Sequence, residues 1–206
     1  MLFAFAVVLS VPQIAPKESE AELVQELIAR TQTTRAPYAL VSSNEIRRDD
    51  ITIHEFSAEF NQGDLHRVET PRDRIVANCR TGWSAHLNIA TGVITHNDAI
   101  SGAACGVYTG DGVRSAEITE ARNSPHGLLQ KLKIETVGGL TRTYEVAPNG
   151  AILSESITDP AGKLRLVMTA ISVSDQVPTG DLFSEPSLAK SVVPLELKEQ
   201  ASEPPR

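Results

Sequence analysis

The chain has 206 residues, of which 41% are apolar and 22% charged, so it can bury a hydrophobic core as one domain or at most two small ones. Its 26 acidic and 19 basic residues give a net charge of −7, which argues against a nucleic-acid-binding protein because phosphate backbones would not be attracted. No internal run of about 18 apolar residues is present, so the sequence predicts no internal membrane-spanning helix.

The amino terminus has the composition of an export signal. Residues 2–11 are continuously apolar and are followed by Pro12. A run of this length is typical of a signal peptide and is too short to span a membrane. We predict that residues 1–15 are a signal peptide. Since no Lys or Arg precedes the run, a buried helix or strand is the alternative.

The chain has two cysteines, Cys79 and Cys105. In an exported protein, which enters an oxidising compartment, two thiols usually pair. A bridge between them would stabilise the fold by roughly 3 kcal/mol in the chain-entropy model. Neither cysteine belongs to a CxxC motif or has a histidine at metal-ligand spacing. We predict a structural disulfide, with two unpaired buried thiols as the alternative.

An amphipathic helix is predicted over residues 19–31. Ser19 and Glu22 have the spacing of a capping box, and several glutamates crowd the first turns, where the helix dipole favours negative charge. Apolar residues then recur at helical spacing. They are Leu23, Val24, Leu27 and Ile28. This helix either packs on the core or forms a movable lid over an apolar cavity.

After Pro37 the apolar pattern changes to a period of two, which is typical of strands. Turn sequences separate the alternating segments. They lie at residues 61–64, 71–73, 90–92, 138–139, 149–150 and 159–162. About eight or more short strands joined by tight turns predict an α+β protein built on a curved antiparallel sheet or barrel.

Three segments depart from this regular pattern. In residues 51–60 the apolar positions change from odd to even, which predicts a β-bulge or a sharp coil. Residues 113–122 are compatible with a short helix or a strand. Residues 186–206 contain scattered prolines and are predicted to form a mostly disordered tail.

The sequence contains no complete catalytic motif. Residues 82–86 (GWSAH) resemble a nucleophile elbow, but a histidine replaces its last glycine. If residues 90–92 form a three-residue hairpin loop, His86 lies opposite His96, close enough for the two imidazoles to share a metal. Two ligands are too few for a firm site. We therefore interpret them as a solvated pair and predict no metal, no cofactor and no enzymatic activity.

Several segments together carry a resemblance to a known family. They are residues 64–69 (DLHRVE), 71–78 (PRDRIVAN), 82–92 (GWSAHLNIATG), 149–150 (NG), 159–162 (DPAG) and 181–183 (DLF). With the export signal and the helix before them, they resemble the periplasmic lipoprotein-sorting carrier superfamily, which includes LolA/LolB-like proteins and regulators of the MucB/RseB type. The resemblance covers about residues 19–183. It implies a periplasmic protein with a single domain, residues 16–185, that forms a half-open antiparallel β-barrel with a helix over its mouth and a hydrophobic cavity for acyl chains.

The sequence thus predicts a non-enzymatic periplasmic protein that binds an apolar ligand, such as the acyl chains of a lipid or lipoprotein. We expect the ligand to lie between the helix and the strand face that carries residues 83, 87 and 89. The lining residues are predicted to be Leu23, Val24, Leu27, Ile28, Trp83, Leu87 and Ile89. The alternative is an interaction or sensor module of the cell envelope that binds a protein partner. A water-poor cavity favours the first function, and a filled core with an apolar outer patch favours the second.

Overall fold

The computed structural model describes residues 19–34, 36–97, 99, 102 and 104–204, so the predicted signal peptide, residues 1–15, lies outside the described residues. The elements, in chain order, are α1 (Glu20–Gln32), β1 (Tyr38–Arg48), β2 (Ile51–Gln62), β3 (Leu65–Glu69), β4 (Asp73–Asn78), β5 (Trp83–Asn88), β6 (Ile94–Thr95), β7 (Val113–Ser124), β8 (Gly127–Thr136), β9 (Thr141–Val146), β10 (Ile152–Thr158), β11 (Leu164–Ser174), the 3-10 helix η1 (Glu185–Ala189) and α3 (Leu195–Ser202). None of the described helices is long and apolar enough to cross a membrane.

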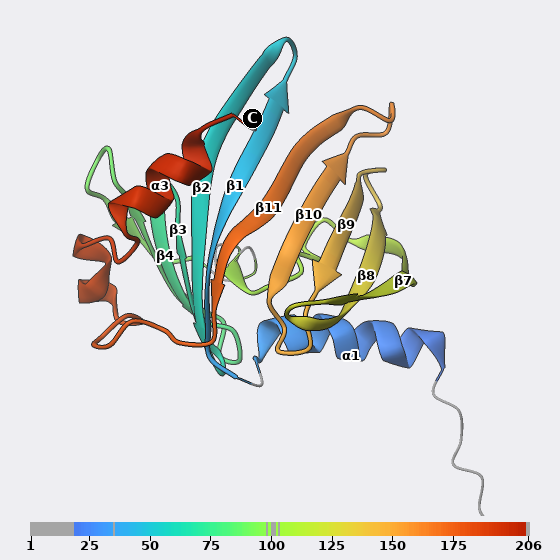
Figure 1. Ribbon diagram of the computed structural model, residues 1–206, viewed down its shortest axis with the longest axis horizontal. Coiled ribbons are helices and arrows are strands. Elements are labelled where there is room, and N and C mark those ends of the chain that lie inside the picture. The colour runs from blue at the N-terminus through green and yellow to red at the C-terminus, as the bar shows by residue number, and fades with distance from the viewer. Residues whose placement is uncertain (1–18, 35, 98, 100–101, 103, 205–206) are drawn as a thin grey trace, which may run out of the picture.

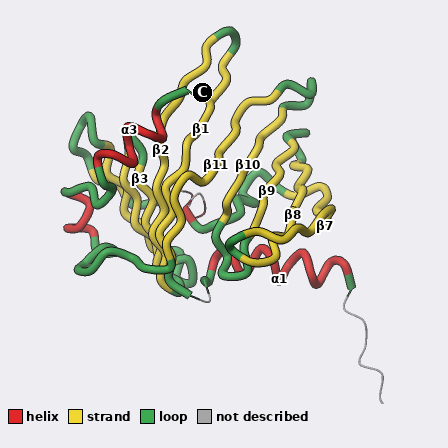
Figure 2. The backbone as a smooth tube through the Cα atoms, in the orientation of Figure 1, coloured by secondary structure: helices red, strands yellow, loops and turns green. Residues whose placement is uncertain are grey.

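The described strands form one antiparallel sheet in the order β6-β5-β4-β3-β2-β1-β11-β10-β9-β8-β7. Strands β1 to β6 and strands β7 to β11 each follow one another as consecutive hairpins, and the pair β1–β11 joins the two series. The sheet curves strongly and stays open, as Figures 1 and 2 show. The predicted α+β class, with a curved, half-open antiparallel barrel and an amino-terminal helix, is confirmed.

Helix α1 begins as predicted. Ser19 and Glu22 form a reciprocal capping box, in which each side chain hydrogen-bonds to the other residue's backbone N–H. The helix then buries Val24, Leu27 and Ile28 against one face of the sheet, which we call the inner face. Their partners come from the connection before β7 and from β8 to β11. The buried ones are Val107, Leu132, Ile134, Tyr144, Val146, Ile152 and Met168.

Two glycines allow the backbone to approach the end of α1 closely. Gly150, in the turn between β9 and β10, has a φ of 98°, and a Cβ there would lie 2.2 Å from the carbonyl oxygen of Arg30. Gly106 has a φ of 71°, and its Cβ would lie 2.4 Å from the Thr31 hydroxyl oxygen. Only glycine fits such positions without displacing backbone. The same hydroxyl accepts a 3.0 Å hydrogen bond from the Val107 N–H and so fixes the connection before β7 to the helix.

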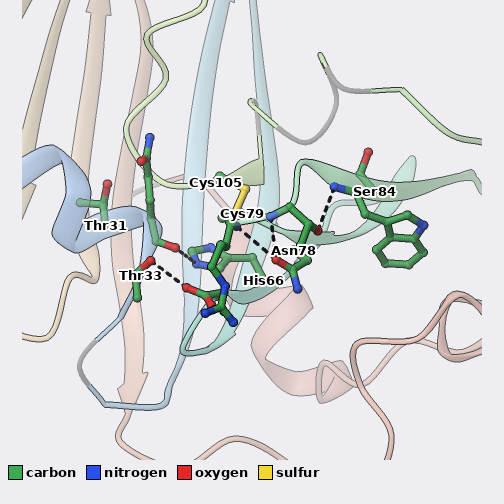
Figure 3. Close-up of a disulfide and its surroundings, with 12 residues drawn as sticks. Thr31, Thr33, His66, Asn78, Cys79, Ser84 and Cys105 are labelled. Atoms are coloured by element: carbon green, nitrogen blue, oxygen red, sulfur yellow. Dashed lines mark hydrogen bonds and ion pairs between the residues drawn. A yellow bond between two sulfur atoms is a disulfide. The ribbon is translucent and has the colours of Figure 1, made fainter.

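The disulfide is confirmed: Cys79, just after β4, is bonded to Cys105, and the Cα atoms lie 5.6 Å apart. The bridge packs with small apolar residues of β3 and β4 on the inner face, beside the end of α1 (Figure 3). His66 lies next to it, with its Nε2 2.9 Å from the Gln32 carbonyl oxygen. The disulfide therefore anchors the connection between β6 and β7, the two edge strands of the sheet, to the inner face.

Residues 186–204 are ordered against the sheet, in place of the expected disordered tail. Helices η1 and α3 cover the opposite face, which we call the outer face, over β1 to β5 (Figure 1). Leu188 of η1 is fully buried against Val76 and Ala85. Val193 and Ala201 pack with apolar side chains of β1 and β2. These chiefly comprise Val41, Phe56, Ala58 and Phe60. The prolines in this segment separate short ordered elements instead of preventing order.

A buried arginine fixes this segment to the sheet. Arg67 of β3 is fully buried and donates to the carbonyl oxygens of Leu182 (2.9 Å), Ser187 (3.2 Å) and Lys190 (2.7 Å). Its Nε also bonds the Glu69 carboxylate at 2.9 Å. Glu69 in turn accepts hydrogen bonds from the residues that follow Lys190. We call residues 182–204 the outer cover. It is attached to Arg67 through backbone carbonyl groups, whose positions cannot be inferred from the sequence pattern.

The β-bulge predicted within residues 51–60 is absent, because β2 pairs with β1 in continuous register from Tyr38–Asn61 to Arg48–Ile51. The change of apolar phase has another cause. Phe56, Ala58 and Phe60 lie on the outer face under α3, whereas Ile51 and Ile53 lie on the inner face near the hairpin tip. Register shifts occur in other strands. They lie in β7, in β10 just after Ile152, and in β11 between Ala170 and Ser172, the partners of Ser42 and Val41. The ambiguous segment 113–122 lies within strand β7.

Candidate functional site

The helical half of the predicted ligand site is part of the core. Val24, Leu27 and Ile28 are buried, and only Leu23 is substantially exposed, at 38%. The apolar stripe therefore already has its partners on β8 to β11. A ligand would reach these three residues only if α1 moved away from the sheet.

The strand half of the predicted site lies elsewhere. Ala85 of β5 packs under Leu188 of η1, so it lies on the outer face. Trp83 and Leu87 are two positions away on either side and share that face, whereas α1 covers the inner face near β7 to β11. Leu87 packs beside Leu188 of η1. The structure therefore does not bring the two halves together: the alternation within β5 is as predicted, but the wrong face was assigned to it.

Four exposed apolar side chains lie on the β5–β6 hairpin, at one edge of the sheet. They are Trp83, Ile89, Val93 and Ile94, with exposed fractions from 37% to 54%. We call these four residues the edge patch. Among the described residues only ten large apolar side chains are exposed, and four of them lie within the twelve positions from residue 83 to residue 94. Such a concentration marks an interaction surface more often than a scatter of single side chains does.

The two histidines of this hairpin have separate partners. His86 is paired with Thr95 rather than with His96, because the loop spans four residues and closes with Asn88 donating to the Val93 carbonyl at 3.0 Å. The Nε2 of His86 lies 2.6 Å from Asp73, and that of His96 lies 3.3 Å from Glu185. Among the described residues, no three His, Cys, Asp or Glu side chains are grouped closely enough to hold a metal ion.

A polar cavity of about 300 Å³ lies on the inner face, between the sheet and the connection before β7. Its walls combine apolar and ionisable side chains. They are Glu59, Gly106, Tyr108, Arg142, Tyr144, Ile152, Glu155 and Met168. We call it the inner cavity. It is not the apolar space that the family resemblance implies, because two carboxylates and a guanidinium line it.

The acidic groups at the inner cavity outnumber the one basic group, Arg142. Arg142 lies between Asp111, at 2.9 Å, and Glu155, at 3.5 Å, and its guanidinium stacks over the Tyr108 ring. Glu59 is 3.5 Å from the Tyr38 hydroxyl, which donates to it. Burial, with a smaller contribution from the Glu155 charge, raises the pKa of Glu59 to about 7. Burial likewise raises the pKa of Glu155.

A second cavity, of about 320 Å³, lies on the outer face between the β1–β11 pair and the segment leading into α3. Its lining is mainly apolar and includes Ala39, Val41, Phe60, Val177 and Leu197. We call it the outer cavity. Sequence reasoning missed it, because the residues that close it belong to the segment expected to be disordered.

Comparison with known proteins finds similarity only in structure: no protein-family model matches the chain, and no curated protein does. An uncharacterized conserved protein from Thermus thermophilus matches with a TM-score of 0.54 at 12% identity, over 87% of this chain and 98% of that one. The Pseudomonas aeruginosa MucA/MucB complex matches with a TM-score of 0.51 at 9% identity, over 80% of this chain and 60% of the matched chain. A LolA superfamily protein from Nitrosomonas europaea gives a TM-score of 0.44 at 8% identity, over 83% and 100%.

The likeness at these identities concerns the fold alone. The chain has a LolA/MucB-like fold, and the resemblance inferred from the sequence is confirmed at that level. The chain spans about three fifths of the matched chain in the MucA/MucB complex, so that chain contains a further part with no counterpart in the present alignment.

Proposed function

We propose that this protein is a non-enzymatic, periplasmic binding protein that uses the edge patch to hold an apolar segment of another envelope protein. The observation that carries the proposal is the half-exposed tryptophan of that patch. Trp83 is 42% exposed and is the only tryptophan of the chain. Tryptophan is among the residues most often found to dominate the energy of protein interfaces.

Two further observations support a protein partner, and a third supports the periplasmic location. The stripe of α1 is packed in the core, and the inner cavity is lined by two carboxylates and a guanidinium, so neither is the open apolar space that an acyl chain needs. The MucA/MucB complex, whose fold this chain shares, is by its name an assembly of two proteins. The disulfide fits an oxidising compartment, as does the predicted export signal.

The test is site-specific photo-crosslinking in the organism that makes the protein. A photoreactive residue at Ile94, inside the edge patch, is expected to give a covalent adduct of defined mass. The matched control is Val137, which is 65% exposed and lies in the turn after β8, in the other half of the sheet. It should give no such adduct, and Trp83→Ala should remove the adduct formed at position 94. The same adducts from both positions, or none from either, would contradict the proposal.

The second candidate function is binding of an apolar ligand, such as an acyl chain, and the outer cavity favours it. Its volume of about 320 Å³ lies at the lower end of the range for small-molecule sites. Native mass spectrometry of the purified full chain tests this candidate by looking for a co-purified lipid. Ala39→Phe, which would fill the outer cavity, should abolish that lipid peak, whereas Leu23→Phe on the exposed side of α1 should leave it unchanged.

A further inference from the structure

The inner cavity contains a carboxylate without a cationic partner. Arg142 already forms ion pairs with Asp111 and Glu155. Within the described part of the chain, no Lys, Arg or His lies within ion-pair distance of Glu59, whose hydrogen-bond partner is the Tyr38 hydroxyl. Glu59 is only partly exposed, and a carboxylate that ionises in such a place without a cationic partner is costly, so this cavity favours an incoming positive charge once Glu59 is ionised.

A second observation points to the same place. Tyr144 also lines the inner cavity and is 2% exposed, and its hydroxyl lies near Arg142, Glu155 and the Tyr108 backbone without a hydrogen bond of normal geometry. Buried hydroxyls in native proteins are normally well paired, so this one can accept a further hydrogen bond from a ligand in the cavity. Asn61, two residues beyond Glu59 on the same face of β2, is 1% exposed, and its amide lies near both Glu59 and Tyr38.

We propose that the inner cavity binds a small primary amine, with Glu59 as the counter-ion of the ammonium group and the Tyr144 hydroxyl as a second acceptor. An ammonium group has three donors and no acceptor, which suits a carboxylate and a hydroxyl facing one space. Ile152 and Met168 provide an apolar wall for the carbon stem of the amine. A metal ion fits less well, because no three His, Cys, Asp or Glu side chains among the described residues are grouped closely enough to hold one.

The protonation of Glu59 makes this binding depend on pH. The groups that face Glu59 are Tyr38 from β1, Arg142 and Tyr144 from β9, Glu155 from β10, His66 on the same face of β3, and Tyr108 and Asp111 from the connection before β7. Burial lowers the pKa of His66 to about 4, so it adds no positive charge near neutral pH. Because the pKa of Glu59 is about 7, the carboxylate accepts an amine fully only above that pH.

Isothermal titration calorimetry of the full chain with 2-phenylethylamine tests the proposal, and 2-phenylethanol is the neutral control of nearly the same shape. We expect the amine to bind at pH 8.5, where it is still protonated, and the alcohol not to bind. At pH 5.5 only about 3% of a carboxyl group with a pKa near 7 is ionised, so the amine should bind about 30-fold more weakly.

Variants separate this site from other sources of binding. Glu59→Gln should remove amine binding, and Tyr144→Phe should weaken it about fivefold, as expected for the loss of one hydrogen bond. The matched control is Glu117→Gln, an exposed carboxylate on β7, which should change nothing. Circular dichroism of each variant establishes that it folds.

Several results would overturn the proposal. They are equal binding of the amine and the alcohol, full binding by Glu59→Gln, or no heat from the amine at either pH. None of them affects crosslinking through the edge patch, so failure here is distinguishable from failure of the proposed function.

Discussion

The two faces of the sheet are covered in different ways. On the inner face α1 packs through apolar side chains, and a disulfide holds the connection that lies beside it. On the outer face the segment 182–204 also makes apolar contacts, but it is held in addition by Arg67, whose guanidinium bonds three backbone carbonyl groups, and by Glu69. Apolar contacts depend on side-chain type, whereas carbonyl groups are present in every residue. Helix α1, the inner cover, can therefore be predicted from the sequence, and the outer cover cannot.

The largest effect is expected where the inner cover meets the core. Leu27 is fully buried, so Leu27→Asp places an unpaired charge among apolar side chains and should lower the free energy of unfolding by more than about 4 kcal/mol. Urea unfolding followed by circular dichroism measures the change. Leu23→Asp, on the exposed side of the same helix, should change it by less than about 0.5 kcal/mol. A native-like, equally stable Leu27→Asp protein would show that α1 is a movable lid after all.

The corresponding change on the outer face is Arg67→Ala. It leaves the Glu69 carboxylate buried with only a distant cation, Arg74 at 3.8 Å, and removes the donors to three carbonyl groups. We expect a loss of about 3 to 5 kcal/mol. Limited proteolysis should then cut first within residues 182–204. Arg80→Ala is the control, since the exposed ion pair of Arg80 with Asp64 contributes about 1 kcal/mol or less. Proteolysis that begins at α1 instead would show that the two covers are not independent.

Removing the disulfide tests how much the inner cover depends on it. The bridge joins residues 26 positions apart, and Cys79→Ser together with Cys105→Ser should cost about 3 kcal/mol in the chain-entropy model. Thiol titration of the unreduced, unfolded wild type should find no free thiol. Two titrating thiols would mean that this face is held by packing alone.

Glu59 gives the stability of the inner face a dependence on pH. Its pKa is raised from 4.5 to about 7 in the folded state, so the folded protein holds this proton more tightly. The stabilising contribution is complete below about pH 4.5 and is lost as pH rises through about 7. Glu59→Gln should therefore be nearly neutral at pH 4.5 and stabilise the fold by about 2 kcal/mol at pH 8, allowing for partial solvation. Equal effects at both pH values in urea titrations would contradict the raised pKa.

The smallest effect is expected at the β5–β6 edge. His86 and His96 each form one partly exposed ion pair, with Asp73 and Glu185. Replacing both by Gln should change the unfolding free energy by well under about 1 kcal/mol. A large loss, or zinc bound stoichiometrically by the wild type alone, would revive the metal interpretation.

The elements that the sequence predicted well are those whose evidence is local. The Ser19 and Glu22 cap, the stripe of α1, the strand alternation and the cysteine pair need only the residues themselves. The bulge predicted in β2 was wrong because α3 buries the outer-face residues Phe56, Ala58 and Phe60, whereas the earlier apolar residues Ile51 and Ile53 belong to the other face at the exposed hairpin tip. The register of the β5–β6 hairpin shifted by one residue because its loop has four residues rather than three.

The candidate sites depended on distant packing and so escaped prediction. The sequence predicted that Trp83 and Leu87 share a face of one strand, but it did not reveal which face of the sheet α1 covers. Glu59 and Glu55 stand on the same face of β2, and no local pattern distinguishes them. Glu55 meets exposed Arg72, whereas Glu59 lies in a cavity that elements more than forty residues away complete.

The pairing of β1 with β11 has a consequence for the kinetics of folding. Every other neighbouring pair in the sheet joins consecutive strands, whereas this seam joins residues about 130 positions apart, such as Leu40 and Val173. Closing so long a loop has a high entropic cost, and pairings of high contact order form slowly. The two strand series should therefore form first as local hairpins and meet at the seam late. Substitutions in the seam should then accelerate unfolding and leave the rate of folding nearly unchanged.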